Sequence, residues 1–131
     1  MKILLSIKPK YVEKIVSGEK KYEFRKTIFK RKQVDTIVVY SSGKVGKLIG
    51  EIRFKTILSD TPLNIWNKTK EEAGLSKEDF FDYFMNKNIA YAVKIESFKP
   101  YGRAVSIQEK YPGVNPPQSF VYVEKDDGNL F

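Results

Sequence analysis

Two residues near the N-terminus, Pro9 and Gly18, divide the start of the chain into three short elements. Before Pro9, the segment Lys2–Ile7 is a compact apolar run of strand length. Proline suits the first position of a helix, and apolar residues then recur at helical spacing as far as Val16. Gly18 stands where a glycine in the left-handed conformation ends a helix. The sequence therefore predicts a strand, a short helix and a second strand over residues 20–25.

The next part of the chain favours β-structure. β-branched residues predict a strand over residues 34–42. Residues 48–59 alternate between apolar and polar closely enough to predict another long strand. The alternation is interrupted at Gly50, where we expect a bulge or a close approach of two backbones.

Helices are expected in the middle of the chain, because three capping signals follow one another. Thr61 precedes a proline, Thr69 begins a Thr-x-x-Glu capping box, and Ser76 begins a similar box with an aspartate at its third helical position. After Ser76, three phenylalanines and Met85 form an apolar stripe that is typical of a helix face in a core.

Strand signals return after this helical part. Residues 89–101 and 103–107 predict two β-segments, and residues 120–125 predict a last short strand. Residues 111–120 hold three prolines and are expected to be irregular, and residues 126–131 are expected to be a tail. Strands, a helical insertion and strands again indicate an α+β fold with a mostly antiparallel sheet that can close on itself.

The residue types that the chain lacks narrow its chemistry. Its 131 residues contain no cysteine and no histidine. These absences exclude disulfides, thiol nucleophiles, Ser-His and Cys-His catalytic pairs and the usual transition-metal ligands. No apolar run approaches the ~20 residues that a membrane-spanning helix requires. We therefore expect a cytoplasmic protein of one domain without a metal, a cofactor or a membrane partner, and the sequence leaves its oligomeric state open.

The positive charge of the chain is concentrated in its first half. The net charge is +8, but residues 1–60 hold 15 basic and 6 acidic residues, whereas residues 61–131 hold 9 and 10. This asymmetry favours an anionic partner for the first half, and nucleic acid is the commonest one. The alternative is that the lysines only solvate the surface. The basic run at residues 30–32 has the same two interpretations, a mobile loop that contacts phosphates or a solvated loop.

The stretch GEKKYEFRK, residues 18–26, places an acid between bases on one face of the second strand. With a two-residue period, Tyr22 and Phe24 point to one side, while Glu23 and Arg25 point to the other. An exposed ion pair between these last two would contribute only about 0–1 kcal/mol. In a cleft, the arginine offers a planar fork to a phosphate or a base, and the carboxylate accepts from an exocyclic amine. The stretch is therefore either a solvated edge or the floor of a ligand site.

One pattern in this stretch resembles the motif of the ASCH domain, a branch of the PUA-like superfamily. The pattern is G-x-K-x-x-E-x-R, formed here by Gly18, Lys20, Glu23 and Arg25. The resemblance continues through VVYSS, IGEI, GLSKEDFFDYF and PPQSF, so it covers nearly the whole chain. It implies a PUA-like fold, a small mixed or antiparallel β-barrel with helices packed at its ends. A single domain over residues 1–131 would form it, with a core over residues 2–123 and a short tail.

The resemblance also implies a function. ASCH and PUA-like domains are associated with binding of RNA, a nucleotide or a modified nucleoside, and with RNA-linked regulation of transcription or translation. In the family the motif lies beside a cleft, which implies that Lys20, Glu23 and Arg25 hold the ligand in a basic cleft here. Without the motif, the position of Lys20 favours an ordinary surface lysine after a helix end. The motif favours a lysine that reaches a phosphate or a base carbonyl.

Lys8 and two serines are further candidates for ligand contacts. Lys8 precedes the first helix, whose N-terminal N–H groups favour anions, although Pro9 removes one of these donors. Ser41 and Ser42 end a strand where the mouth of the barrel is expected. Small hydroxyl side chains at that place suit a backbone turn as well as a ligand.

The proline-rich loop supplies the last candidates. Gln118 can read a base edge and Ser119 can bond it, while the aromatic ring of Phe120 can stack on a base. The alternative is that this loop closes the end of the barrel, with Phe120 as its plug.

An enzyme is an alternative to a binding domain. One PUA-like relative hydrolyses N4-acetylcytidine with a lysine and a threonine at the motif positions, whereas this chain has Lys20 and Glu23 there. A carboxylate does not replace threonine in acyl transfer, because the acyl product would be an anhydride. Glu23 can instead act as a general base on water while Lys20 holds the oxyanion. A ribonuclease that uses Lys20 and Glu23 is a second alternative, and a protein-interaction domain with an acidic partner is a third.

Overall fold

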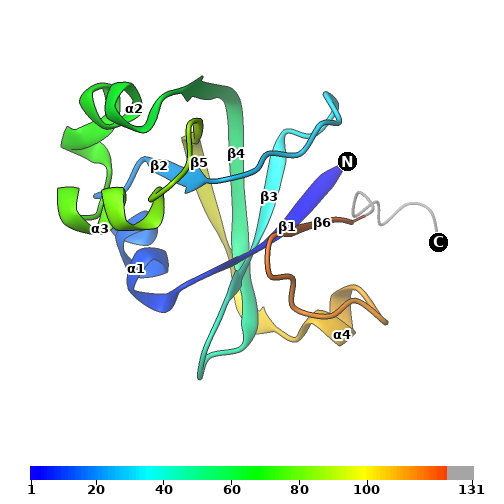
Figure 1. The fold of residues 1–131 in the computed structure, drawn as a ribbon. Helices are drawn as coiled ribbons and strands as arrows, with labels where there is room; N and C mark the ends of the chain where they lie inside the picture. Colours follow the sequence, from blue (N-terminus) through cyan, green and yellow to red (C-terminus); the bar gives the residue numbers. More distant parts are fainter. Residues whose placement is uncertain (124–131) are drawn as a thin grey trace.

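The computed structural model describes residues 1–123, which form a six-stranded sheet with helices packed around it (Figure 1). The strands are β1 (Lys2–Ile7), β2 (Tyr22–Arg25), β3 (Thr36–Ser41), β4 (Lys47–Asp60), β5 (Ala90–Val105) and β6 (Phe120–Val123). The helices are α1 (Pro9–Ser17), α2 (Pro62–Thr69), the 3-10 turn η1 (Lys70–Glu72), α3 (Lys77–Tyr83) and α4 (Ile107–Lys110). The expected tail and the last two residues of the expected strand 120–125 lie outside the described residues.

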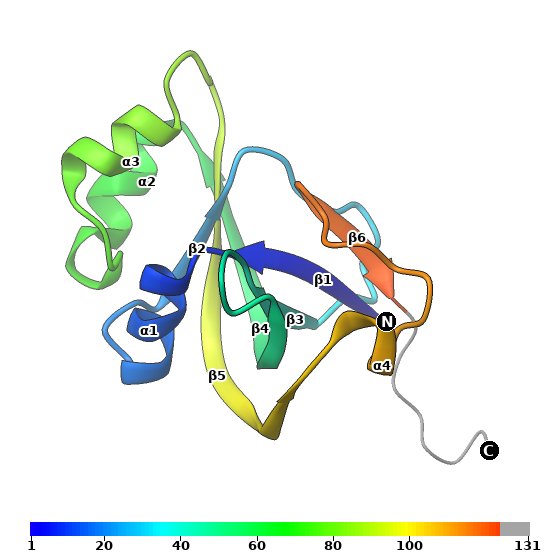
Figure 2. The same ribbon diagram turned by 90° about the horizontal axis from the view of Figure 1, so that it is seen from below.

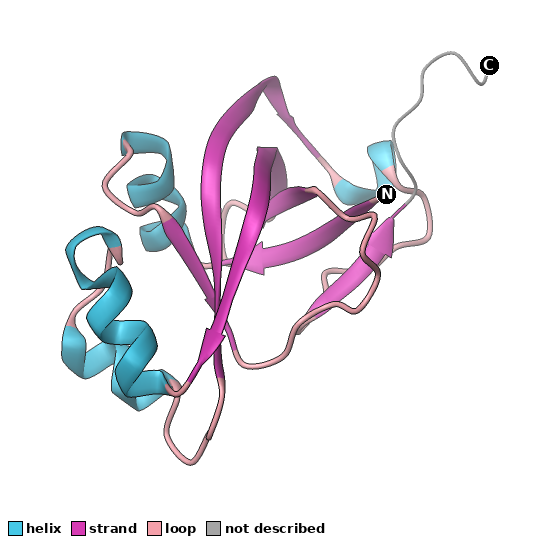
Figure 3. Cartoon of the chain, turned by 90° about the horizontal axis from the view of Figure 1, so that it is seen from above, coloured by secondary structure: helices cyan, strands magenta, loops and turns pink. Residues whose placement is uncertain are grey.

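The sheet has the strand order β2-β5-β4-β3-β1-β6 and curls into a half-barrel (Figure 3). β1 and β3 run parallel, and the other neighbouring strands are antiparallel. The predicted α+β fold with a mixed, mostly antiparallel sheet is confirmed. A hydrogen bond from a side chain links the two edges of the sheet, β2 and the segment just before β6. Arg25, the last residue of β2, donates from Nη2 to the carbonyl oxygen of Ser119, just before β6, at 3.1 Å.

The helix α1 begins and ends where the sequence predicts. Pro9 is its first residue, and Gly18 follows it with φ 85°, so that the Gly18 N–H donates to the carbonyl of Ile15 at 3.1 Å. Val12 and Ile15 are buried in the main core with residues of β1, β3 and β4. The backbone N–H of Lys20 donates to the carbonyl of Lys14 at 2.9 Å. α1 therefore fixes the point from which β2 starts.

A second core lies where α2, η1 and α3 cover β2 and the start of β5 (Figures 1 and 2). Phe80 is fully buried at its centre, with ring-centroid distances of 5.0 Å to Phe24 of β2 and 5.1 Å to Trp66 of α2. The predicted apolar stripe is core at Phe80, whereas Met85 is 63% exposed because it follows the end of α3. None of the helices within residues 1–123 has the length and apolarity needed to cross a membrane.

Two of the three predicted helix caps are confirmed. The hydroxyls of Thr61 and Ser76 accept hydrogen bonds from the backbone N–H three residues later, at 3.3 and 3.0 Å. The predicted capping hydrogen bond at Thr69 is wrong, because its hydroxyl donates to the carbonyl of Ile65 at 2.8 Å, although a further turn, η1, does begin at the next residue.

β5 is one long strand where the sequence predicts two segments. Its pairing with β4 continues to Val105 because the register shifts at several points, one of them beside Gly50. A Cβ at Gly50 would lie 2.6 Å from the carbonyl oxygen of Lys99, so the predicted close approach of two backbones is confirmed. The prediction for residues 103–107 is wrong at its end, since Ile107 begins α4.

Candidate functional site

A cavity of about 530 Å³ opens at the seam between the two edges of the sheet. Its walls come from the end of β1, the start of α1, β2, the region around α3 and the loop before β6. Such a volume is typical of a site for a small ligand. Five of the residues predicted to contact a ligand lie on its walls: Lys8, Lys20, Glu23, Arg25 and Gln118.

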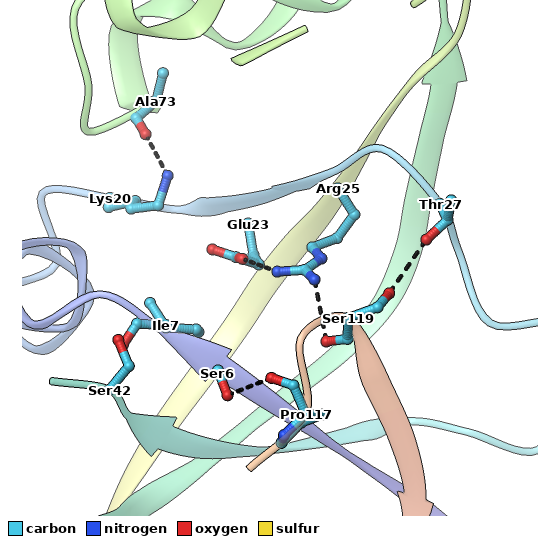
Figure 4. A network of polar contacts seen from close by, with 10 residues as sticks. All are labelled: Ser6, Ile7, Lys20, Glu23, Arg25, Thr27, Ser42, Ala73, Pro117 and Ser119. Carbon is cyan, nitrogen blue, oxygen red and sulfur yellow. Dashed lines mark hydrogen bonds and ion pairs between the residues drawn. The ribbon is translucent and has the colours of Figure 1, made fainter. Parts of the chain in front are cut away.

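Glu23 and Arg25 form an ion pair on the wall of this cavity (Figure 4). Arg25 donates from Nη1 to Glu23 Oε2 at 3.3 Å and from Nη2 to the Ser119 carbonyl at 3.1 Å. Glu23 is only 6% exposed, and within the described part of the chain no donor bonds its Oε1 atom. The site thus holds a largely buried carboxylate with one open acceptor, beside a guanidinium that is fixed on two sides.

Lys20 is buried and is not the ordinary surface lysine that its place after a helix end suggests. It is 3% exposed, and its Nζ donates to the carbonyl of Ala73 at 2.8 Å (Figure 4). The same atom lies 4.7 Å from the centre of the Phe24 ring. Burial lowers the pKa of the Lys20 ammonium to about 8, although the nearby Glu23 carboxylate raises it. Lys20 is therefore a constrained amine that can lose its proton just above neutral pH.

We expect the protein to gain stability relative to a Lys20→Met variant as the pH rises from about 8 to 10.5, the ordinary lysine value. Because the Lys20 pKa is lower in the folded state, the unfolded chain binds more protons between these two values. The cost of a buried ammonium is fully present below pH 8 and is relieved above it, with a slope of at most about 1.4 kcal/mol per pH unit. Urea unfolding of both proteins across this range measures the difference. Parallel pH profiles would contradict the expectation.

The loop before β6 is tied down by side chains from two directions (Figure 4). Ser6 donates from Oγ to the carbonyl of Pro117 at 2.7 Å, and the hydroxyls of Thr27 and Ser119 lie 3.3 Å apart. Gln118, between these anchors, lies on the cavity wall. Ser119, a predicted ligand contact, is not on the wall, because its hydroxyl meets Thr27 and its carbonyl is bonded to β2.

Three other residues for which the sequence suggests a ligand contact make contacts within the fold. Ser41 is 2% exposed within β3, and Ser42 donates from its backbone N–H and its hydroxyl to the carbonyl of Ile7, at 3.0 and 3.3 Å. Neither serine lies on the cavity wall. Phe120 packs against Phe29 with a ring-centroid distance of 5.9 Å and is partly buried against the main core. These contacts give the residues a structural role, and the ligand contacts of Ser41 and Ser42 remain predictions.

The sequence analysis predicts only five of the fourteen residues that line the cavity. Lys10 and Tyr11 of α1 also line it, as do Asp79, Asp82 and Tyr83 from α3. The spacing of the two aspartates, three residues apart on one helix, places them on the same face and was the signal available. The cavity therefore has a basic side at the start of α1 and an acidic side on α3. Desolvation raises the pKa of the Tyr83 phenol, against a smaller opposite effect of the nearby guanidinium.

A second hollow, of about 520 Å³, lies beside β5 and α4. Two of its three charged residues, Arg103 and Glu109, are 70% and 48% exposed in their side chains and are paired with each other. Buried charges with shifted pKa values mark functional sites more strongly than exposed ion pairs do. The cavity at the seam is therefore the candidate site.

Comparison with known proteins gives a family and a set of relatives. The ASCH domain family matches residues 5–111, a range that includes every wall residue named above except Gln118. A curated protein of Zymomonas mobilis, named an ASCH domain-containing ribonuclease, is 28% identical over 127 residues, which cover 95% of this chain and 85% of that protein.

Solved structures show the same fold. The crystal structure of ASCH from Zymomonas mobilis has a TM-score of 0.87 and 27% identity, and the match covers 98% of this chain and 91% of that one. A tyrosine-to-phenylalanine variant of it also has a TM-score of 0.87, with 26% identity and coverage of 98% and 94%. The N-terminal domain of Staphylothermus marinus McrB has a TM-score of 0.60 with 10% identity over 98% and 91% of the two chains, a likeness of fold alone. The predicted PUA-like fold is confirmed.

Proposed function

Because the chain belongs to the ASCH domain family, we propose that it binds RNA and holds one nucleotide of the strand in the cavity at the seam. The relative from Zymomonas mobilis is named a ribonuclease, which favours RNA as the class of ligand. We place this binding in RNA-linked regulation of transcription or translation in the cytoplasm. The observation that carries the proposal is the buried Glu23–Arg25 pair on the wall of a cavity of about 530 Å³.

The wall offers a group for each part of a nucleotide. Lys8 and Lys10, at the start of α1, supply positive charge for a phosphate. Glu23 Oε1 accepts a hydrogen bond from an N–H on a base edge, and the Gln118 amide offers both a donor and an acceptor. The ring of Tyr11 also lines the cavity and offers an aromatic contact to a base, while the ammonium groups of Lys10 and Lys20 lie 4.9 and 5.3 Å from its centre. This arrangement suits a nucleotide better than a simple anion, which would need no acceptor.

An Arg25→Lys variant should bind RNA about tenfold more weakly. Lysine keeps the charge, but a single ammonium does not reproduce the planar fork that holds Glu23 and the Ser119 carbonyl together, and ~1.4 kcal/mol of lost interaction is a factor of ten. Fluorescence anisotropy of a labelled single-stranded RNA at one fixed salt concentration measures the effect. The matched control is Arg103→Lys, at an exposed arginine outside the cavity.

The wild-type affinity should also fall steeply as salt is added, because phosphate contacts release counterions. Arg103→Lys should bind as the wild type does. Absence of RNA binding in the wild type, or equal losses in the two variants, would remove the cavity from the proposal.

RNA cleavage is a second candidate function, favoured by Lys20. An amine with a pKa of about 8, in the same cavity as a carboxylate, is suited to take a proton from a ribose hydroxyl. Wild-type protein should then release shorter fragments from single-stranded RNA, and Lys20→Met should not, whereas a control variant at the exposed Lys21 should remain active. N4-acetylcytidine in a parallel reaction tests the amidohydrolase alternative. Intact substrate in every reaction would leave binding as the function.

A further inference from the structure

The first part of the loop between β2 and β3, residues 26–33, carries four cations and no acid, and the acid that follows, Asp35, pairs with Arg53 at 3.7 Å. We call it the basic loop, and its cations are Lys26, Lys30, Arg31 and Lys32. All four are exposed, and no carboxylate of residues 1–123 forms an ion pair with any of them. Their charge is therefore available to an external anion.

The basic loop is held in place although its cations are exposed. Phe29, in its middle, is 7% exposed and packs into the main core, 5.6 Å from Phe54 between ring centroids. The backbone N–H groups of Lys30 and Arg31 donate to the hydroxyl of Tyr122 on β6, at 3.0 and 3.3 Å. The guanidinium of Arg31 lies 4.5 Å from the centre of the Tyr122 ring. An anchored loop loses little conformational entropy when it binds.

The basic loop continues directly from the wall of the cavity. It begins at Lys26, the residue after Arg25, and its Thr27 hydroxyl meets that of Ser119 at 3.3 Å, beside the wall residue Gln118. From there the loop runs along β6, as its bonds to Tyr122 and the view from below show (Figure 2). A strand that leaves the cavity past Gln118 would therefore meet the cations in sequence.

We propose that the basic loop is a second contact surface for single-stranded RNA, which binds the phosphates next to the nucleotide held in the cavity. This inference rests on the proposed function and extends it from one nucleotide to a strand. Lys30 and Lys32 contact phosphates, while Arg31 is held by Tyr122 and by the sulfur of Met1, 3.2 Å from its Nη1 atom. Each phosphate contact on single-stranded nucleic acid adds about 0.7 to the slope of log affinity against log salt.

The test is a double variant, Lys30→Gln with Lys32→Gln, which removes two charges and leaves the anchors of the loop in place. Its matched control is Lys70→Gln with Lys87→Gln, two exposed lysines in η1 and in the loop after α3, which form no ion pair within residues 1–123 and do not line the cavity. Anisotropy titrations with a short single-stranded oligonucleotide and with a mononucleotide, at several salt concentrations, compare them. We expect the loop variant to bind the oligonucleotide several-fold more weakly at low salt, with a salt slope smaller by about 1.4, and the control to match the wild type.

The failure of this inference is distinguishable from the failure of the proposed function. If the wild type binds the oligonucleotide and the loop variant behaves as the control does, the second surface is wrong while RNA binding stands. If the wild type binds no RNA, the proposed function fails first. Displacement of the oligonucleotide by polyglutamate at equal charge concentration would overturn the assignment of the loop to nucleic acid. A loop variant that loses mononucleotide affinity as strongly as oligonucleotide affinity would also contradict the proposal.

Discussion

Glu23→Gln should abolish a preference of the cavity for cytidine over uridine. In the wild type, the open Oε1 atom of Glu23 accepts from an exocyclic amine but repels a carbonyl oxygen at the same position. A correct donor–acceptor match of this kind discriminates between bases by about 1–3 kcal/mol, which is roughly 5- to 150-fold. In the variant, the glutamine oxygen keeps the bond from Arg25 and the amide N–H faces the base, so it matches the carbonyl of uridine instead of the amine of cytidine. We therefore expect the preference for cytidine to be lost and uridine to bind at least as tightly.

Competition between two RNA strands that differ at one cytidine or uridine measures this effect. The substitution is nearly isosteric, and the glutamine oxygen still accepts from Arg25, so unfolding in urea should confirm that the variant folds. A carboxylate in the core of an interface must face a donor, because an unmatched buried acceptor loses its hydration without compensation. A wild type that binds both strands equally would show that no base meets Glu23.

Gly74→Ala should destabilise the fold by about 2–5 kcal/mol. Gly74 has φ +74°, a conformation that costs other residues ~1–2 kcal/mol, and a Cβ there would lie 2.4 Å from Cβ of Lys20. The Cβ atom of Lys20 is bonded directly to the backbone, so a change of side-chain rotamer cannot move it away from the new methyl group. Overpacking of this kind adds about 1–3 kcal/mol to the loss of stability. Lys20 would be pushed from its bond to the Ala73 carbonyl.

Gly18→Ala is the matched control for this prediction. Gly18 has φ +85°, but a Cβ there would meet nothing within 4 Å, so only the backbone cost of ~1–2 kcal/mol applies. The difference between the two variants in urea unfolding isolates the contact with Lys20. Equal losses of stability would mean that the Lys20 side chain is free to move, and the account of a constrained amine would be wrong.

The parts of the fold that the sequence predicts well are those that depend on neighbouring residues. Pro9 begins α1 because its fixed φ suits the first helical position, where its missing N–H costs nothing. Gly18 ends the helix because it adopts a positive φ. Both effects depend only on residues within one helical turn. The cap at Ser76 is equally local. Thr69 shows the limit of such signals, because the competing acceptor in α2 takes its hydroxyl. β5 runs past its apparent break because pairing with β4 outweighs local preference.

The candidate site depends on contacts between residues that are far apart in the sequence. The burial and the partners of its side chains therefore cannot be predicted from local sequence patterns. The motif identifies Lys20, Glu23 and Arg25, and all three lie on one cavity. Nothing local reveals that Lys20 is buried, since its partner Ala73 is 53 residues away. The bond from Arg25 to Ser119 spans 94 residues and joins two sheet edges. The motif therefore identifies residues that line the cavity, and the fold determines their burial and their hydrogen-bond partners.

The most direct test of the account is a crystal structure of the protein with a short single-stranded RNA that contains cytidine. The account predicts one base inside the cavity, with its amine within hydrogen-bond distance of the Glu23 carboxylate, and the following phosphates along residues 26–33. An RNA strand bound at another face, with the cavity between α1, β2 and α3 left to solvent, would contradict it.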